Sequence, residues 1–260
     1  MSRTIRRGLF LGAFLVFLLA TYVAVLYAQG YKYSLAQGQF FRTGAIALKA
    51  NADADVFIEG KRAGSTSFLT NSFSIDGLLP DQYTIRLEHE NFSSWEKKVA
   101  VQEGLVIDFP HILIIPASGS EREKLMKDIE ELFPKVRATP TPSVSPLPTG
   151  AFYVKSGNLY QMVIQDAEPE LIAKQVVGFA LTENERKLAW WTRNELWVQF
   201  LSDTDYQPIR RKDDRELITR FSQPIKTAAW FRGEDHLVVD SGGYRIVETD
   251  TRGGVNIISL

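Results

Sequence analysis

The chain has 260 residues, with 30 lysines and arginines against 31 aspartates and glutamates, and it contains no cysteine. The balanced charge argues against a nucleic-acid surface, and the lack of cysteine excludes disulfides and thiolate metal sites. The 16 Phe, 9 Tyr and 5 Trp residues favour β-structure, in a chain long enough for two modest domains.

An uncharged stretch over residues 8–28 lies directly behind Arg3, Arg6 and Arg7. At about 1.5 Å per residue it reaches roughly 31 Å, which matches the hydrocarbon core of a bilayer. Because flanking arginines stay in the cytoplasm, residues 1–7 are predicted as a cytoplasmic stub, residues 8–28 as a single transmembrane helix, and the rest as extracytoplasmic. The residues that mark the predicted anchor are Gly8, Leu11, Phe14, Leu18, Tyr22 and Leu26.

A cleaved signal peptide is the competing interpretation of this stretch. Signal sequences usually have only about 7–15 apolar residues and are cleaved after small residues. The best cleavage site here, Leu26-Tyr27-Ala28, has a large residue where a small one is preferred. A retained anchor is therefore favoured, and Gly8 and Gly12 form a G-x-x-x-G pattern that permits pairing with another helix.

Residues 44–116 read as a compact all-β segment of six or seven short strands. A tight turn is expected at Glu59-Gly60-Lys61, and a second at Leu78–Gln82. These features predict a small β-sandwich. The expected apolar strand segments are 45–48, 56–58, a weaker one at 68–75, 83–87, 95–101, 106–109 and 112–115.

Several short motifs in this segment resemble those of PEGA domains, which are small extracytoplasmic β-sandwiches. The matching stretches are Val56–Gly60, Ala63–Thr66, Leu79–Ile85, Asn91-Phe92 and Trp95. The name-giving tetrapeptide is replaced by Asn51–Ala54, and two usual glycines are Asp81 and Asn91, residue types that tolerate left-handed backbone. The resemblance implies an extracytoplasmic fold and brings no catalytic residues.

Residues 117–150 form a predicted spacer. A helix is expected over Ser120–Phe133, with Ser120 and Glu123 as a capping box and Pro134 as its end. Leu125, Ile129 and Leu132 make a narrow apolar stripe, which is expected to dock on the chain's own domain rather than on a partner. The proline-rich stretch over residues 138–150 follows as an extended linker.

Three hairpin-like stretches recur in residues 151–260, at 155–160, 192–197 and 241–246. With the strands before them they give a repeat of roughly 49 residues and four strands, which is typical of propeller blades. The segment resembles TolB-type and WD40-like propellers, with about two and a half blades. Three interpretations stay open: a truncated propeller, closure by association with another copy, or an open stack of sheets whose strand 255–260 is an edge.

The sequence gives little evidence of catalytic or metal chemistry. His89, His111 and His236 lack partners at ligand spacing, so neither a metal nor another cofactor is predicted. Glu183 with Glu185, and Asp213-Asp214 with Glu216, read as solvated turns. The possible ligand face consists of Trp190, Trp191, Trp197 and Trp230, for which packing between sheets is the favoured alternative.

These observations predict a mainly β, non-enzymatic protein anchored once in the cell membrane of a bacterial envelope. Its expected partners are the lipid bilayer, an envelope protein or glycan, and another copy of the chain through the open C-terminal sheet. The alternative is a subunit of an envelope enzyme or sensor. An acidic pocket formed by Asp203, Asp213 and Asp250 would favour the enzyme.

Overall fold

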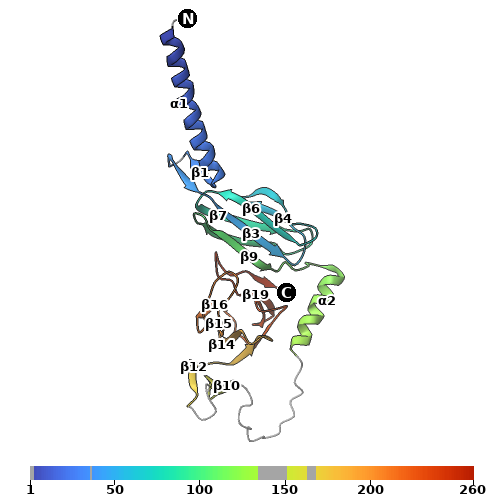
Figure 1. Ribbon diagram of the computed structural model, residues 1–260. Helices are drawn as coiled ribbons and strands as arrows, with labels where there is room; N and C mark the ends of the chain where they lie inside the picture. Colours follow the sequence, from blue (N-terminus) through green and yellow to red (C-terminus); the bar gives the residue numbers. More distant parts are fainter. Residues whose placement is uncertain (1–2, 36, 134–150, 163–167) are drawn as a thin grey trace. The chain divides into compact units, whose positions relative to one another are not determined.

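The computed structural model describes residues 3–35, 37–133, 151–162 and 168–260 (Figure 1). The protein is mainly β, with an N-terminal apolar helix and several antiparallel sheets, none of which closes on itself, so the predicted fold class is confirmed. The chain divides into two compact units. The first contains residues 1–86 and 98–112, and the second contains residues 87–97 and 113–260.

The first unit begins with helix α1, Arg3–Ala28, and none of the side chains of this helix is buried. A short hairpin of β1 (Tyr31–Ser34) and β2 (Gln39–Arg42) follows it. Phe40 of β2 meets Tyr27 edge-on at 6.3 Å and Tyr33 at 5.1 Å between ring centroids. The base of the helix is thus joined to an aromatic hairpin that the sequence analysis did not predict.

Two sheets follow, and the alternating burial of β3 and β8 shows that one face of each sheet enters an apolar core. The three-stranded sheet has the order β6-β3-β9, with β3 and β9 parallel, and the four-stranded sheet has the order β5-β4-β7-β8. The strands are β3 (Gly44–Ala50), β4 (Asp55–Ile58), β5 (Lys61–Ser65), β6 (Ser72–Leu78), β7 (Asp81–Glu88), β8 (Trp95–Val101) and β9 (Val106–Ile112).

Both predicted turns are present, and Gly60 takes the expected positive φ of 72°. Asn91 adopts φ 64°, in agreement with its proposed replacement of a glycine. Asp81 instead begins strand β7. The weak strand expected at 68–75 lies at Ser72–Leu78, because Phe68 and Leu69 are 90% and 88% exposed in the preceding loop.

The second unit is built on three antiparallel meanders, referred to here as the first, second and third sheets. Their strand orders follow the sequence, so each strand pairs with the next one along the chain. The three predicted hairpins are the turns between β10 and β11, β14 and β15, and β18 and β19. The first sheet contains β10 (Phe152–Lys155), β11 (Asn158–Gln161) and β12 (Glu170–Lys174); the second β13 (Gly178–Leu181), β14 (Lys187–Trp191), β15 (Glu195–Phe200) and β16 (Arg215–Arg220); and the third β17 (Thr227–Trp230), β18 (His236–Asp240), β19 (Tyr244–Glu248) and β20 (Ile257–Ser259).

Successive sheets pack through apolar clusters, and β14 is buried on both of its faces. Leu188 and Trp190 face the cluster shared with the first sheet, and Ala189 and Trp191 face the cluster shared with the third. Gly178 is opposite Trp191, where a Cβ atom would lie 2.5 Å from the indole ring. A glycine is therefore required at this position by the close approach of Trp191.

The predicted spacer helix is α2, Gly119–Leu132. Its N-cap is Ser118, whose side chain makes no capping hydrogen bond, so the predicted box of Ser120 and Glu123 is wrong. The apolar stripe does dock within its own domain: Leu125 and Ile129 pack with residues of β18 and β19. The segment 112–115, predicted as a strand, supplies Leu113 and Ile115 to the same cluster, since β9 ends at Ile112. The linker prediction and Pro134 lie outside the described residues.

Candidate functional site

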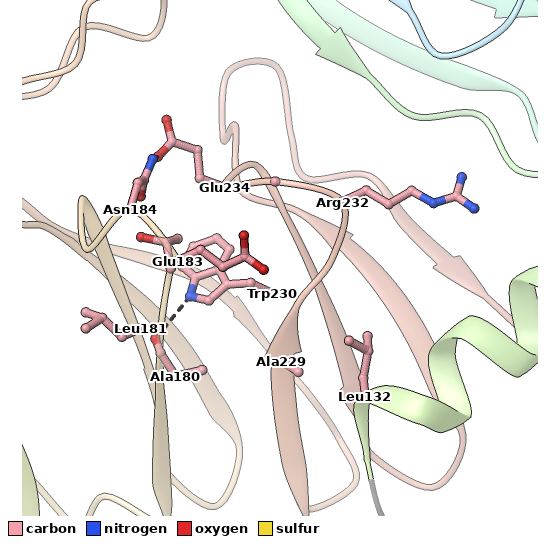
Figure 2. Close-up of a pocket in the computed structure, with 11 residues that line it drawn as sticks. Leu132, Ala180, Leu181, Glu183, Asn184, Ala229, Trp230, Arg232 and Glu234 are labelled. Carbon is pink, nitrogen blue, oxygen red and sulfur yellow. Dashed lines mark hydrogen bonds between the residues drawn. The ribbon is translucent and has the colours of Figure 1, made fainter.

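A cleft of about 640 Å³ lies in the second unit, where β13 of the second sheet adjoins β17 of the third (Figure 2). Its walls come from three chain segments: the end of β13 with the following turn, the end of β17 with the following turn, and the last residue of α2. Its lining residues are Leu132, Ala180, Leu181, Thr182, Glu183, Asn184, Ala229, Trp230, Arg232, Gly233 and Glu234.

Trp230 is fixed in this cleft by a hydrogen bond between the two sheets. Its indole N–H donates to the carbonyl oxygen of Ala180 at 3.0 Å, shown as a dashed line in Figure 2. The ring is partly buried against the cluster between the second and third sheets. The ring is therefore held in one orientation, as a recognition surface requires.

The polar rim of the cleft joins the two turns. The Asn184 amide nitrogen donates to Glu234 Oε2 at 2.8 Å. Arg232 is 3.4 Å from Asp128 and stacks over the ring of Phe231, and Figure 2 shows its side chain directed away from Trp230. Among the described residues, Glu183 is exposed and has no hydrogen-bond or ion-pair partner.

A buried polar network supports Glu234 from below the rim. Lys187, at the start of β14, donates to Asp235 Oδ1 at 2.8 Å, to the backbone oxygen of Glu234 at 2.9 Å and to the Tyr206 hydroxyl at 2.9 Å. These three bonds use all three donors of the ammonium group. The second sheet is thus linked to the turn that follows β17.

The Tyr206 hydroxyl lies 2.8 Å from Glu234 Oε1 and 2.7 Å from Asp235 Oδ1, so it donates its single proton to a carboxylate. Burial raises the pKa of Tyr206 far above its ordinary value, and the nearby Asp235 and Glu234 charges raise it further. The phenol therefore stays protonated and acts as a hydrogen-bond donor between the carboxylates of Glu234 and Asp235.

A second buried network in the same unit surrounds Glu248. Lys97 Nζ is 3.1 Å from Glu248 Oε2, with side-chain exposures of 0% and 6%. Trp95 Nε1 donates to Glu248 Oε1 at 3.3 Å, Asn256 Nδ2 donates to Oε2 at 2.9 Å, and Lys97 also donates to the backbone oxygen of Asp250 at 2.6 Å. Burial raises the pKa of the Glu248 carboxyl, and the Lys97 charge opposes that rise.

The four tryptophans of the predicted ligand face do not share one surface. Trp190 and Trp191 are 4% and 5% exposed and lie in the two inter-sheet clusters. Trp197 stacks on Trp190 at 5.8 Å, and its indole nitrogen donates to Glu195. Of the four, Trp230 alone lines the cleft.

The remaining predicted residues have separate places. Arg3, Arg6 and Arg7 and the marker residues of the anchor lie on α1, which is the one described helix long and apolar enough to span a membrane. Asp203 accepts a bond from the Lys212 backbone, Asp250 pairs with Arg252 at 2.6 Å, and neither they nor Asp213 line the cleft. No group of three metal-binding side chains occurs within the described residues.

Sequence reasoning missed most of the cleft. The sequence predicts a solvated turn at Glu183 and does not single out Lys187, Tyr206 or Glu234. A usable signal was a lysine opening an otherwise apolar strand, Lys187-Leu188-Ala189-Trp190-Trp191, because a lysine at a buried position needs a carboxylate partner.

Comparison of the chain with protein-family models gives no match, and comparison with curated proteins gives none.

Proposed function

We propose that this protein is a non-enzymatic, single-pass membrane protein of the bacterial envelope that holds its β-domains outside the cytoplasm to bind a protein or glycan. The observation that carries the proposal is α1. This helix is apolar along its length and buries none of its side chains, which supports a lipid environment for it. The arginines at its start favour a cytoplasmic N-terminus.

The resemblances described above belong to this proposal. A two-sheet β segment after the anchor is what a PEGA-like domain implies, and two successive four-stranded meanders are in keeping with propeller-like blades. The cleft beside Trp230 supports a binding role, since ligand sites are concave, mostly apolar and carry a few oriented polar groups.

Cysteine labelling in a bacterial host tests the proposed topology. Because the chain contains no cysteine, Thr4→Cys and Ser222→Cys each introduce a single reactive thiol, at the start of α1 and in an exposed turn of the second unit. In intact spheroplasts, a membrane-impermeant maleimide should label S222C, and it should label T4C only after lysis.

Two results would contradict the proposal. One is labelling of T4C, but not of S222C, in unlysed spheroplasts. The other is a mature product whose mass lacks α1 and which is found in the soluble fraction, as a cleaved signal peptide requires. A cysteine-free parent chain is the matched control for background labelling.

A further inference from the structure

We propose that the cleft beside Trp230 binds an organic cation, namely the ammonium or guanidinium group of a lysine or arginine side chain on a partner protein. This inference rests on the proposed display function, because it specifies what the displayed domain recognises. The inference depends on which hydrogen-bonding groups of the cleft have partners within the protein and which remain available to a ligand.

Each of the four side chains with donor groups that line the cleft already makes at least one bond within the protein. The indole N–H of Trp230 is bonded to Ala180, and the Asn184 amide donates to Glu234. The hydroxyl of Thr182 donates to the Lys187 backbone oxygen at 3.2 Å. Arg232 is placed toward Asp128 and over Phe231, away from the cleft interior in Figure 2.

The carboxylate acceptors of the cleft, by contrast, have sites that remain available to a ligand. Glu183 brings two carboxylate oxygens for which the described residues provide no donor. Glu234 Oε2 accepts a bond from Asn184, and Oε1 competes with Asp235 for the single Tyr206 proton, whereas a carboxylate has about four acceptor sites in total. The cleft therefore presents free acceptors and negative charge to a ligand.

The remaining walls fit the other parts of a basic side chain. The π face of an indole attracts a cation within about 6 Å of its centre, and such contacts contribute about 0.5–2 kcal/mol. Leu132, Leu181 and Ala229 offer apolar surface for the aliphatic stem that lysine and arginine bury while their charged ends remain polar.

Other ligand classes fit less well. An anion would meet the carboxylates of Glu183 and Glu234, which outnumber the one lining cation, Arg232, and Arg232 is placed beside Asp128. A neutral sugar brings no positive charge to pair with the carboxylates of Glu183 and Glu234. A cation requires acceptors alone.

Ligand-observed saturation-transfer NMR on the full chain in nonionic detergent tests this inference. The probes are the pentapeptides Gly-Gly-Lys-Gly-Gly and Gly-Gly-Arg-Gly-Gly, the same peptide with norleucine at its centre, spermidine, and the neutral disaccharide maltose. Saturation transfer and a measurable Kd are expected for the lysine and arginine peptides, and none for norleucine or maltose.

Glu183→Gln removes the free carboxylate at an exposed position where folding does not depend on it. The Kd should rise about tenfold or more, since hydrogen bonds to charged groups contribute about 1.5–3 kcal/mol. Glu185→Gln is the matched control, because Glu185 is exposed in the same turn and does not line the cleft. Its Kd should equal that of the unmodified chain.

The inference is overturned by equal binding of the norleucine and lysine peptides, by maltose binding that E183Q weakens, or by equal affinities of E183Q and E185Q. Binding of spermidine without the peptides also overturns it, because the cation would then be a free amine. A negative result here, with S222C labelled as expected, would leave the proposed topology intact. Reversed labelling would overturn the topology whether or not the peptides bind.

Discussion

Replacing Lys97 by methionine should destabilise the second unit strongly. The ammonium group is fully buried beside Glu248 and also bonds the backbone oxygen of Asp250. Methionine keeps the length of the stem, so the change removes the charge without opening a large cavity. Removing one partner of a buried ion pair costs about 3–5 kcal/mol, because the other charge is left unpaired.

Urea denaturation followed by tryptophan fluorescence measures this effect on the full chain in detergent. All five tryptophans belong to the second unit, so the signal reports its unfolding. Lys98→Met is the matched control: Lys98 is exposed on the opposite face of β8 and should change the free energy of unfolding by less than about 0.5 kcal/mol. The double variant K97M/E248M should recover part of the loss, because both charges are removed together while Trp95, Asn256 and the Asp250 backbone oxygen still lose their bonds.

The pH dependence gives a second check on the same residues. Burial places the folded-state pKa of Glu248 above its unfolded value of about 4.3, so stability from this group is fullest below that pH and falls as pH rises toward the folded pKa. The Lys97 charge lowers this pKa, so its removal raises the folded-state pKa of Glu248 further. The pH range over which the protein loses stability then extends upward, and the loss is at most about 1.4 kcal/mol per pH unit. K97M should therefore cost more at pH 8 than at pH 5. An equal cost at both pH values, or a K97M curve that overlays K98M, would refute the reasoning.

Three further predictions concern the packing of the second unit, each read out by the same urea denaturation. Ile129→Ala should cost about 2–5 kcal/mol, since Ile129 is fully buried between α2 and the third sheet, whereas exposed Glu130→Ala should leave the transition nearly in place. Gly178→Ala should cost about 1–3 kcal/mol, as its Cβ atom would lie 2.5 Å from the Trp191 ring; an unchanged midpoint would show that the ring yields freely. Trp191→Phe should cost far less than the roughly 3–5 kcal/mol expected for Trp191→Ala, because the buried indole nitrogen has no hydrogen-bond partner among the described residues, and similar losses for both would contradict this account.

Local patterns in the sequence predicted the elements that depend on local causes. Alternating apolar residues gave the β7 and β8 strands, and helical spacing gave the stripe of α2. The segment 112–115 shows where this reasoning fails. Its apolar run reads as a strand, yet Leu113 and Ile115 are buried in a cluster with helix α2 and with residues of the third sheet more than 100 positions later in the chain.

The candidate site was predictable only in part for the same reason. Trp230 was visible as a residue type suited to recognition. Glu183 and Glu234 are 51 positions apart, in turns that look like ordinary solvated loops. Their convergence depends on the pairing of neighbouring sheets through Lys187, and no single window of sequence contains that information.

The apolar cluster beneath α2 joins residues that are synthesised early to residues that are synthesised much later. Leu125 and Ile129 leave the ribosome more than 100 residues ahead of Val238 and Ile246, the partners that cover them. Contacts of such long sequence separation form late, and an uncovered apolar surface is prone to aggregation in the meantime. A nascent chain stalled before the third sheet would leave this apolar helix face exposed, so folding of the second unit should depend on a chaperone that shields the face until β18 and β19 have been made.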